Sequence, residues 1–451
     1  MLGETTIVYN AKVVTHTGCR QGWVEIKGGV VTERGGGTEC PARHADKYLD
    51  AKGAFLMPGL VDSHVHFREP GLESKGTIRS ESLAAVAGGV CTVFDMPNTV
   101  PATTTVARLT EKMLMAQWNG CYTRYHALLG ITPGGLCELK KLETDRAAAV
   151  KLFLGTSTGA MAAPEGQELE DIFRYCADHA LPIIVHAEDN DIIAANTAAA
   201  IAQYGSADKI PVSMHQAIRS REACLKASAR AVELAERFGT RLHLAHISTA
   251  DEVRQLLTEG SSVGKLITAE TTPLYLDPIL AHETNRTSLH KVNPAIKTPA
   301  DAEALRNALY TGAIDTIGTD HAPHLLSEKK LPGITAASGA PSIQFALPLM
   351  LSYLQPEKIV EKMTVGPAAV FDLACNINFG VGQPADMTLV REVEPYYITY
   401  SDVLSTCAWT PFAGREIRHR VERTWVAGKE VWNNGPTQGF AANINISIAR
   451  K

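Results

Sequence analysis

The chain has 451 residues, 45% of them hydrophobic and 20% charged, which is ordinary for a globular protein that buries its own core. A formal net charge of −5 without a basic stripe argues against a nucleic-acid partner, and nine scattered cysteines without a CxxC pair argue against a disulfide framework. Neither a secretion signal nor an apolar run of about 18 residues is evident, so we expect a cytoplasmic protein that does not bind membranes.

The two ends of the chain have the pattern of short strands. Valine-rich runs divided by Gly and Asn occur near the start, in TTIVYNAKVV and GWVEIKGGVV, and near the end, in ADMTLVREV and HRVERTWVAGKEVW. We expect residues 1–55 and 371–451 to meet in one small β-domain that is discontinuous in sequence.

Residues 56–370 alternate short apolar runs with helical segments. The helical segments include Glu165–His179, Arg219–Phe238 and Ala300–Ala313. The apolar runs are FLMPGLVDSH, CTVFDMPN, RYHALLG, VKLFLG, PIIVHAE, RLHLAHIS, KLITAET and DTIGTDH. This β-then-α repetition predicts an α/β protein with a (β/α)₈ TIM barrel, whose active site gathers at the C-terminal ends of the strands.

The first apolar run ends in an HxH motif. His64 and His66 point to the same side of a strand, because side chains alternate along it, and two imidazoles there can chelate one zinc ion. For an isolated HxH, two surface or core histidines are the favoured interpretation, so the metal-site interpretation depends on the other residues of the set. His186 and His246 close two later runs, and Asp320 closes the eighth. His243, three residues before His246, is expected on the opposite strand face, packed against helices.

Lys151 opens VKLFLG, a run that should be largely buried. A protonated lysine there is costly unless it is paired, and burial favours loss of the proton. A neutral amine can add CO₂ to form a carbamate, whose two oxygens can bridge two metal ions. The alternative is a lysine whose head group reaches the barrel mouth and binds a carboxylate.

The chain resembles the amidohydrolase superfamily in five motifs that occur in the same order: MPGLVDSHVHFREPG, VKLFLG, IVHAED, LHLAHISTADEV and IGTDHAPH. Within that superfamily it resembles the dihydroorotases in HVHFREPG, VFDMPNTVPATTT, DHAPH, VNPAIK and TPFAG. The resemblance implies two zinc ions, one held by His64, His66 and Asp320 and the other by His186 and His246, with carboxylated Lys151 as the bridge. It also implies that Arg68, Asn98 and His324 bind a substrate carboxylate and that Asn293 binds the pyrimidine ring. The chain departs from the family in two places. It has NPAIK where close relatives often have NPPxR, so Lys297 replaces an arginine, and it has ETTPLYL where the family is usually rich in histidine.

The resemblance implies reversible cyclisation of N-carbamoyl-L-aspartate to L-dihydroorotate and water, in pyrimidine biosynthesis, by a zinc-bridged hydroxide with Asp320 as the proton shuttle. A homodimer is also implied. The alternatives are a dihydropyrimidinase, hydantoinase or allantoinase, which share the metal ligands, and a metal-free scaffold relative. LPGITAASGAPS is either a loop that closes over substrate or a plain connector.

Overall fold

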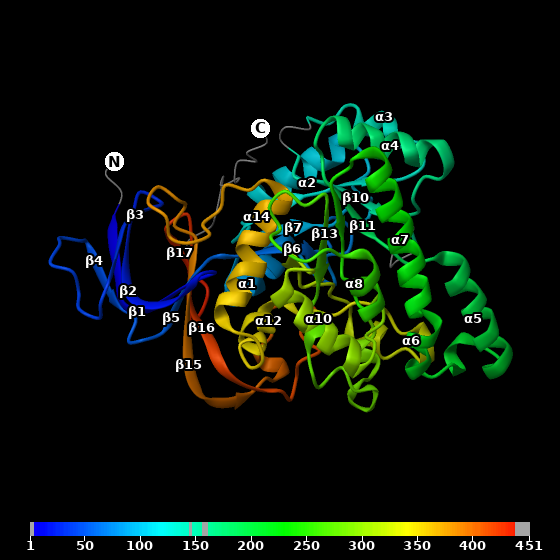
Figure 1. Ribbon diagram of the computed structural model, residues 1–451. Coiled ribbons are helices and arrows are strands. Elements are labelled where there is room, and N and C mark those ends of the chain that lie inside the picture. The colour runs from blue at the N-terminus through cyan, green and yellow to red at the C-terminus, as the bar shows by residue number, and fades with distance from the viewer. Residues whose placement is uncertain (1–3, 144–146, 156–160, 438–451) are drawn as a thin grey trace.

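Strands from both ends of the chain form one sheet, on the left in Figure 1. The computed structural model describes residues 4–143, 147–155 and 161–437. The eight-stranded sheet has the order β17-β16-β15-β5-β1-β2-β3, with β4 paired to β1. β1 pairs antiparallel with β2 and parallel with β5, and β5 pairs antiparallel with β15. The bounds are β1 Thr5–Thr15, β2 Gly18–Lys27, β3 Val30–Gly36, β4 Lys47–Asp50, β5 Phe55–Pro58, β15 Met387–Tyr397, β16 Glu416–Val426 and β17 Lys429–Asn433.

The segment between these ends contains two parallel ladders, one of six strands in the order β14-β13-β12-β11-β10-β9 and one of three in the order β6-β7-β8. Each expected apolar run supplies at least one of these strands. The bounds are β6 Leu60–Val65, β7 Val90–Asp95, β8 Arg124–Ala127, β9 Leu129–Ile131, β10 Val150–Phe153, β11 Ile183–His186, β12 Leu242–Leu244, β13 Ile267–Thr271 and β14 Thr316–Ile317.

Helices flank the parallel strands (Figure 1). The expected helical segments are confirmed as α4, α7 and α10, and Ser220 caps α7 by accepting a hydrogen bond from the Ala223 backbone N–H. Among the described helices, none has both the length and the apolar character needed to cross a membrane. The bounds are α1 Ile78–Ala87, α2 Val106–Trp118, α3 Leu136–Leu139, α4 Gly166–Asp178, α5 Asn190–Tyr204, α6 His215–Ile218, α7 Arg221–Phe238, α8 Ala250–Leu256, α9 Pro273–Leu276, α10 Pro299–Thr311, α11 Leu326–Lys329, α12 Ile343–Met350, α13 Pro356–Val360 and α14 Gly366–Phe371. The 3₁₀ turns are η1 Ala207–Lys209, η2 Val212–Met214, η3 Glu283–Asn285, η4 Ser288–His290, η5 Gly333–Thr335 and η7 Tyr400–Asp402, and η6 Glu361–Val365 is a π-helix.

The two faces of the parallel strands bury different side chains. One face supplies Val150 and Val185 to the large cluster shared with the flanking helices. The other face supplies Ile184 to a smaller cluster that contains Phe371 of α14. Because Lys151 is the register partner of Ile184, it lies on this second face, and alternation along β11 places His186 there as well.

A buried ion pair joins the terminal sheet to the parallel strands. Arg124 of β8 binds Asp386, which precedes β15, through Nε–Oδ2 and Nη2–Oδ1 contacts of 2.7 and 3.1 Å. A two-point guanidinium–carboxylate contact fixes orientation as well as distance. The terminal sheet therefore supports the strands that carry the candidate site.

Candidate active site

His64, His66 and Asp320 form a cluster whose potential ligand atoms lie within 4.8 Å of one another. His66 Nε2 lies 3.1 Å from Asp320 Oδ1, and His64 Nε2 lies 3.6 Å from the same oxygen. The histidines come from the end of β6 and Asp320 follows β14, although they are more than 250 residues apart in sequence. Two imidazole nitrogens and a carboxylate oxygen are a donor set that divalent transition metals bind.

The other ring nitrogen of each histidine is held by a neighbour. Nδ1 of His64 lies 2.8 Å from Oε1 of Glu270, and Nδ1 of His66 lies 2.6 Å from Oδ1 of Asn98. Because a carboxylate or amide oxygen accepts, Nδ1 carries the proton in both rings. The lone pair of each Nε2 is then directed at the centre of the cluster, as in protein metal sites.

Glu270, near the end of β13, is a candidate functional residue that the sequence analysis did not identify. Its carboxylate accepts hydrogen bonds from Ser63 and His64 and lies 3.8 Å from Nε2 of His243. Burial alone would raise its pKa, but His64 and His243 beside it hold the pKa well below its usual range. Glu270 belongs to the KLITAET run and is the first residue of the ETTPLYL stretch that departs from the family. Its position at a strand end was the available signal.

We expect Glu270→Gln to weaken metal binding by about 10- to 100-fold, because such changes beside a metal-binding histidine typically have this effect. The substitution keeps the side-chain shape but removes the negative charge that orients His64. Competition with a chromogenic chelator would measure the affinity. Glu252→Gln is the matched control, since Glu252 is a buried carboxylate bound by Ser228 and Thr249. Equal metal affinity in the two variants would contradict the role of Glu270.

His243 corrects one sequence expectation. Its ring is enclosed between strands, with Nδ1 2.9 Å from Thr268 Oγ1 and Nε2 3.3 Å from Thr316 Oγ1. Its register partner Ile184 places it on the face that carries Lys151 and not on the opposite face, as was expected. It does contact a helix, because its ring lies edge-on 5.8 Å from Phe371 of α14. The expectation was wrong because β12 ends at Leu244 and His246 has a φ of 40°, so two-residue alternation does not extend from His243 to His246.

His186 and His246 form a second group beside the first. Nδ1 of His186 lies 2.9 Å from Nε2 of His246, and the His246 ring centroid lies 5.3 Å from that of His64. Burial, followed by the neighbouring His186 and His64, holds the pKa of His246 well below its usual range. His246 Nδ1 is buried and has no hydrogen-bond partner. The neutral imidazole form is the one that binds metals.

Lys151 is fully buried among these groups, and its Nζ has no hydrogen-bond partner. Nζ lies 5.2 Å from the centroid of the Phe153 ring. Burial lowers the pKa of Lys151 to about 8, against the opposing charges of Glu270 and Asp320. The Phe153 ring in turn lies 5.9 Å from the His186 ring. The charge of Lys151 contributes to the lowered pKa of His64, His66, His186 and His246.

Three residues at the site have backbone conformations that L-amino acids rarely adopt. Arg68, His246 and Asp320 have φ values of 71°, 40° and 48°. Such conformations cost on the order of 1–3 kcal/mol each and persist only where the surroundings fix them. Asp62 helps to fix Asp320: it accepts hydrogen bonds from N and Oγ1 of Thr319, at 2.9 and 2.5 Å.

Arg68 and His324 lie beside the histidine cluster. Arg68 is buried, and its Nε donates to the Pro323 carbonyl at 2.8 Å. Burial lowers the pKa of Arg68 to about 10. Its charge, after burial, contributes to the lowered pKa of both His66 and His324. His324 Nε2 is buried without a hydrogen-bond partner, so a neutral imidazole and a guanidinium are both available to a ligand.

Asn293 is joined to the cluster only indirectly in the part of the chain that the structure describes. Its Oδ1 is buried and has no hydrogen-bond partner. The next residue, Pro294, accepts a 2.6 Å hydrogen bond from the Tyr275 hydroxyl. Tyr275 belongs to α9, which follows β13, so this hydrogen bond links the Asn293 segment to the strand that carries Glu270.

Comparison with known proteins agrees with this geometry. The sequence profile of the amidohydrolase family matches residues 55–431. The chain belongs to the amidohydrolase family. This amidohydrolase is 35% identical to a dihydroorotase from Syntrophobacter fumaroxidans over 402 residues, which cover 84% of the chain and 85% of that protein. It is 32% identical to a dihydroorotase from Halobacterium salinarum over 405 residues, or 88% and 92% of the two chains.

Solved structures show the same fold. An L-hydantoinase (dihydropyrimidinase) from Arthrobacter aurescens superposes with a TM-score of 0.89 at 27% identity, covering 99% of this amidohydrolase and 100% of that chain. A dihydropyrimidinase from Brevibacillus agri gives 0.85 at 22% identity, with the same shares covered. The family and its dihydroorotase and hydantoinase members indicate a hydrolase of cyclic amides that uses a metal cofactor.

Proposed function

We propose that the chain is a dihydroorotase, which interconverts N-carbamoyl-L-aspartate and L-dihydroorotate plus water. The observation that carries this proposal is the buried Arg68 guanidinium beside His324, next to the His64–His66–Asp320 cluster. Dihydroorotate is a ring that bears a carboxylate, and the positively charged guanidinium of Arg68 can bind that carboxylate. The dihydroorotase relatives support the same substrate.

The residues present fit a pair of metal ions. Lys151 Nζ and His246 Nδ1 are buried polar atoms without partners, and such atoms are costly unless something binds them. His64, His66 and Asp320 would hold one ion, and His186 and His246 the other. We infer that the resident metal is zinc, which imidazole and carboxylate ligands suit.

Lys151 would join the two ions as a carbamate. Its burial and its lowered pKa increase the fraction of neutral amine over that of an exposed lysine, and the lone pair of this neutral form attacks the carbon of CO₂. The nitrogen then loses a proton, and the product is an anion with two oxygens. This modification would replace an unpartnered buried amine by an anion that could bind the metal ions held by the two histidine groups.

In ring opening, Asp320 takes the proton of the attacking water and transfers it to the ring nitrogen as the amide bond breaks. Metal ions held by these residues would supply a water of lowered pKa and polarisation of the ring carbonyl. Asp320 suits this task because its Oδ1 faces His64 and His66, and because its side chain is only 13% exposed. Ring closure uses the same groups in reverse.

The substrate carboxylate would be bound by Arg68, Asn98 and His324. Charge-assisted hydrogen bonds from a guanidinium are among the stronger polar contacts in proteins. Asn98 would donate through Nδ2 while its Oδ1 orients His66. Asn293, with its buried and unpartnered Oδ1, would accept a hydrogen bond from the pyrimidine ring.

We also infer that the two parallel ladders close into a (β/α)₈ barrel. β9 follows β8 after one residue, and at the other gap the His66 N–H donates to the His321 carbonyl at 2.8 Å, where Val65 and His321 form a parallel bridge. We propose residues 56–370 as the barrel domain, and residues 1–55 and 371–451 as the two parts of the β-domain.

Arg68→Gln should lower kcat/KM for dihydroorotate by roughly 10- to 100-fold, the usual effect of losing hydrogen bonds from a charged group. The reason is that glutamine cannot offer the substrate carboxylate a positive charge. Dihydrouracil, which lacks the carboxylate, provides the control within the same enzyme. Steady-state kinetics on both substrates should show a larger loss for dihydroorotate, and equal losses would refute the assignment.

A substrate panel tests the proposed function as a whole. We expect the metal-loaded enzyme to open dihydroorotate with a kcat/KM at least about 100-fold above that for dihydrouracil, hydantoin or allantoin, because a site built for a charged group discriminates strongly. Because a hydantoinase structure is also similar to this chain, a preference for hydantoin or dihydrouracil would contradict the proposal and indicate a hydantoinase or dihydropyrimidinase. Inactivity on all four substrates would indicate the scaffold alternative.

A further inference from the structure

Two buried lysines outside the candidate metal centre bind neutral oxygens. Lys329, at the end of α11, is fully buried, and Lys291 is 8% exposed. Lys329 Nζ donates to the carbonyls of Lys291, Ala337 and Gly339 at 2.9, 2.8 and 2.9 Å. Lys291 Nζ donates to the Ala336 carbonyl at 2.7 Å and to Ser338 Oγ at 2.8 Å. Among the described residues, neither ammonium has a carboxylate within 4.0 Å.

These contacts fix residues 336–339, here called the 336–339 loop, which belong to the LPGITAASGAPS stretch. The loop lies against His324, because a Cβ added at Gly339 would be 2.9 Å from His324 Cδ2 and 2.8 Å from the Ala322 carbonyl oxygen. The Gly339 N–H also donates to the Lys291 carbonyl at 2.9 Å. The two lysines therefore connect the His324 side of the site to the segment that leads to Asn293.

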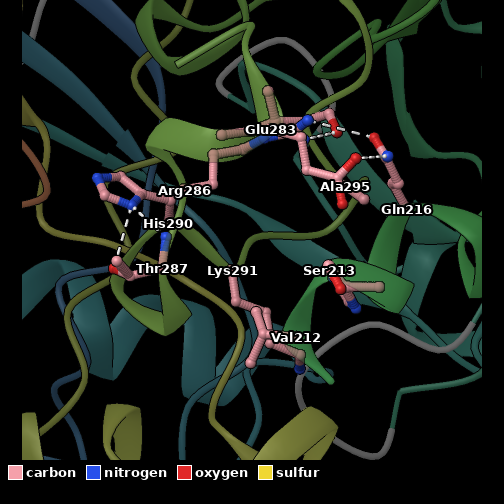
Figure 2. Close-up of a pocket in the computed structure, with 11 residues that line it drawn as sticks. Val212, Ser213, Gln216, Glu283, Arg286, Thr287, His290, Lys291 and Ala295 are labelled. Atoms are coloured by element: carbon pink, nitrogen blue, oxygen red, sulfur yellow. Dashed lines mark hydrogen bonds between the residues drawn. The ribbon is translucent and has the colours of Figure 1, made fainter. Parts of the chain in front are cut away.

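The Asn293 segment is largely buried, but part of it borders a pocket. Lys291, Ala295 and Ile296 line a pocket of about 380 Å³, a volume that includes space open to solvent. Figure 2 shows Lys291 and Ala295 at this pocket together with Arg286 and Ser213. Asn293 and His324 do not line it. Since close packing normally holds a backbone in place, a segment beside a cavity depends more on its hydrogen bonds.

Burying two ammonium groups without counter-charges is costly. Burial and the charge of Lys291 hold the pKa of Lys329 well below its usual range, and burial followed by the charge of Arg219 lowers that of Lys291 to about 8. Lys329 gains some compensation from the Trp409 ring, whose centroid is 5.6 Å from Nζ. Trp409 Nε1 in turn donates to the His324 carbonyl at 2.7 Å. An apolar side chain would avoid the cost but could not bind several carbonyls at once.

We propose that Lys291 and Lys329 are positioning residues that hold His324 and Asn293 at the separation needed to bind substrate. This inference rests on the proposed function, in which those two residues bind opposite parts of dihydroorotate. Neither lysine touches substrate or metal, so their effect passes through the 336–339 loop and the Lys291 backbone.

The test compares Lys329→Met and Lys291→Met with wild type, with Lys362→Met as the matched control. Lys362 is a buried lysine, 1% exposed at its side chain, and it binds Glu361 at 2.9 Å. Hydrogen exchange of the Ala337 and Gly339 amides is measured first, because both donate within this network. Kinetics on dihydroorotate follow. We expect faster exchange and a KM raised by roughly tenfold or more in the two lysine variants, with kcat changed by less than about threefold.

A merely structural role would lower thermal stability in all three variants without moving the KM. Unchanged exchange at residues 336–339, or an unchanged KM, in Lys291→Met would overturn the proposal even if Lys329→Met does not fold. If wild type fails to open dihydroorotate, the proposed function fails, and the exchange measurement still tests the contacts of the two lysines.

Discussion

Asp320→Asn should lower kcat by about 10²- to 10⁴-fold, the range that a positioned acid–base group contributes, while metal stays largely bound. Asparagine keeps the size of the side chain and one oxygen near His64 and His66, but it cannot take up a proton at pH 7. Asp320 Oδ1 is also the oxygen that faces both Nε2 atoms, at 3.6 and 3.1 Å. Turnover of dihydroorotate and metal content by plasma emission are measured on the same sample.

Asp315→Asn is the matched control for this prediction. Asp315 is a buried carboxylate just before β14 that binds Lys265 at 3.1 Å and accepts from the Ala269 N–H at 2.9 Å. Its replacement should affect stability and leave kcat nearly unchanged. A metal-loaded Asp320→Asn enzyme with near-wild-type kcat would show that another group moves the proton.

Lys151→Ala is expected to have the second large effect, loss of most bound metal and a fall in kcat of about 100-fold or more, because the proposed bridging anion could not form. The truncated side chain leaves space between the two histidine groups where a carboxylate from solution can bind. Added acetate or propionate should therefore restore part of the metal content and part of the activity. Both quantities are followed as the acid concentration rises.

Lys362→Ala serves as the control, since it removes a buried lysine that binds Glu361 instead of lying among histidines. Small acids should have no effect on that variant. If Lys151→Ala kept full metal occupancy and activity without added acid, a carbamate at Lys151 would be unnecessary and the proposed bridge would be wrong.

The sequence predicted those parts of the site that follow from strand periodicity. His64, His66, Lys151 and His186 lie at or beside strand ends, where two-residue alternation decides the direction of each side chain. The prediction failed for His243, because strand geometry stops at Leu244 and the positive φ of His246 changes the direction of the chain. A positive φ at a single residue cannot be predicted from the pattern of hydrophobic residues.

Other features depend on partners that are distant in sequence. Glu270 acquires its role only because β13 brings it to Nδ1 of His64, 206 residues away. Lys329 likewise donates to the Lys291 carbonyl, 38 residues away in sequence. The sequence alone does not distinguish such a buried lysine from a lysine on the surface. The order of the strands was predictable, whereas these cross-chain contacts required the folded structure.

Anomalous X-ray diffraction at the zinc edge, from crystals of the metal-loaded chain, tests the central claim most directly. We predict two anomalous peaks, one beside His64, His66 and Asp320 and one beside His186 and His246, with extra density on Lys151 Nζ between them. A map with no peak at these side chains, or with an unmodified Lys151 that contacts neither ion, would contradict the account.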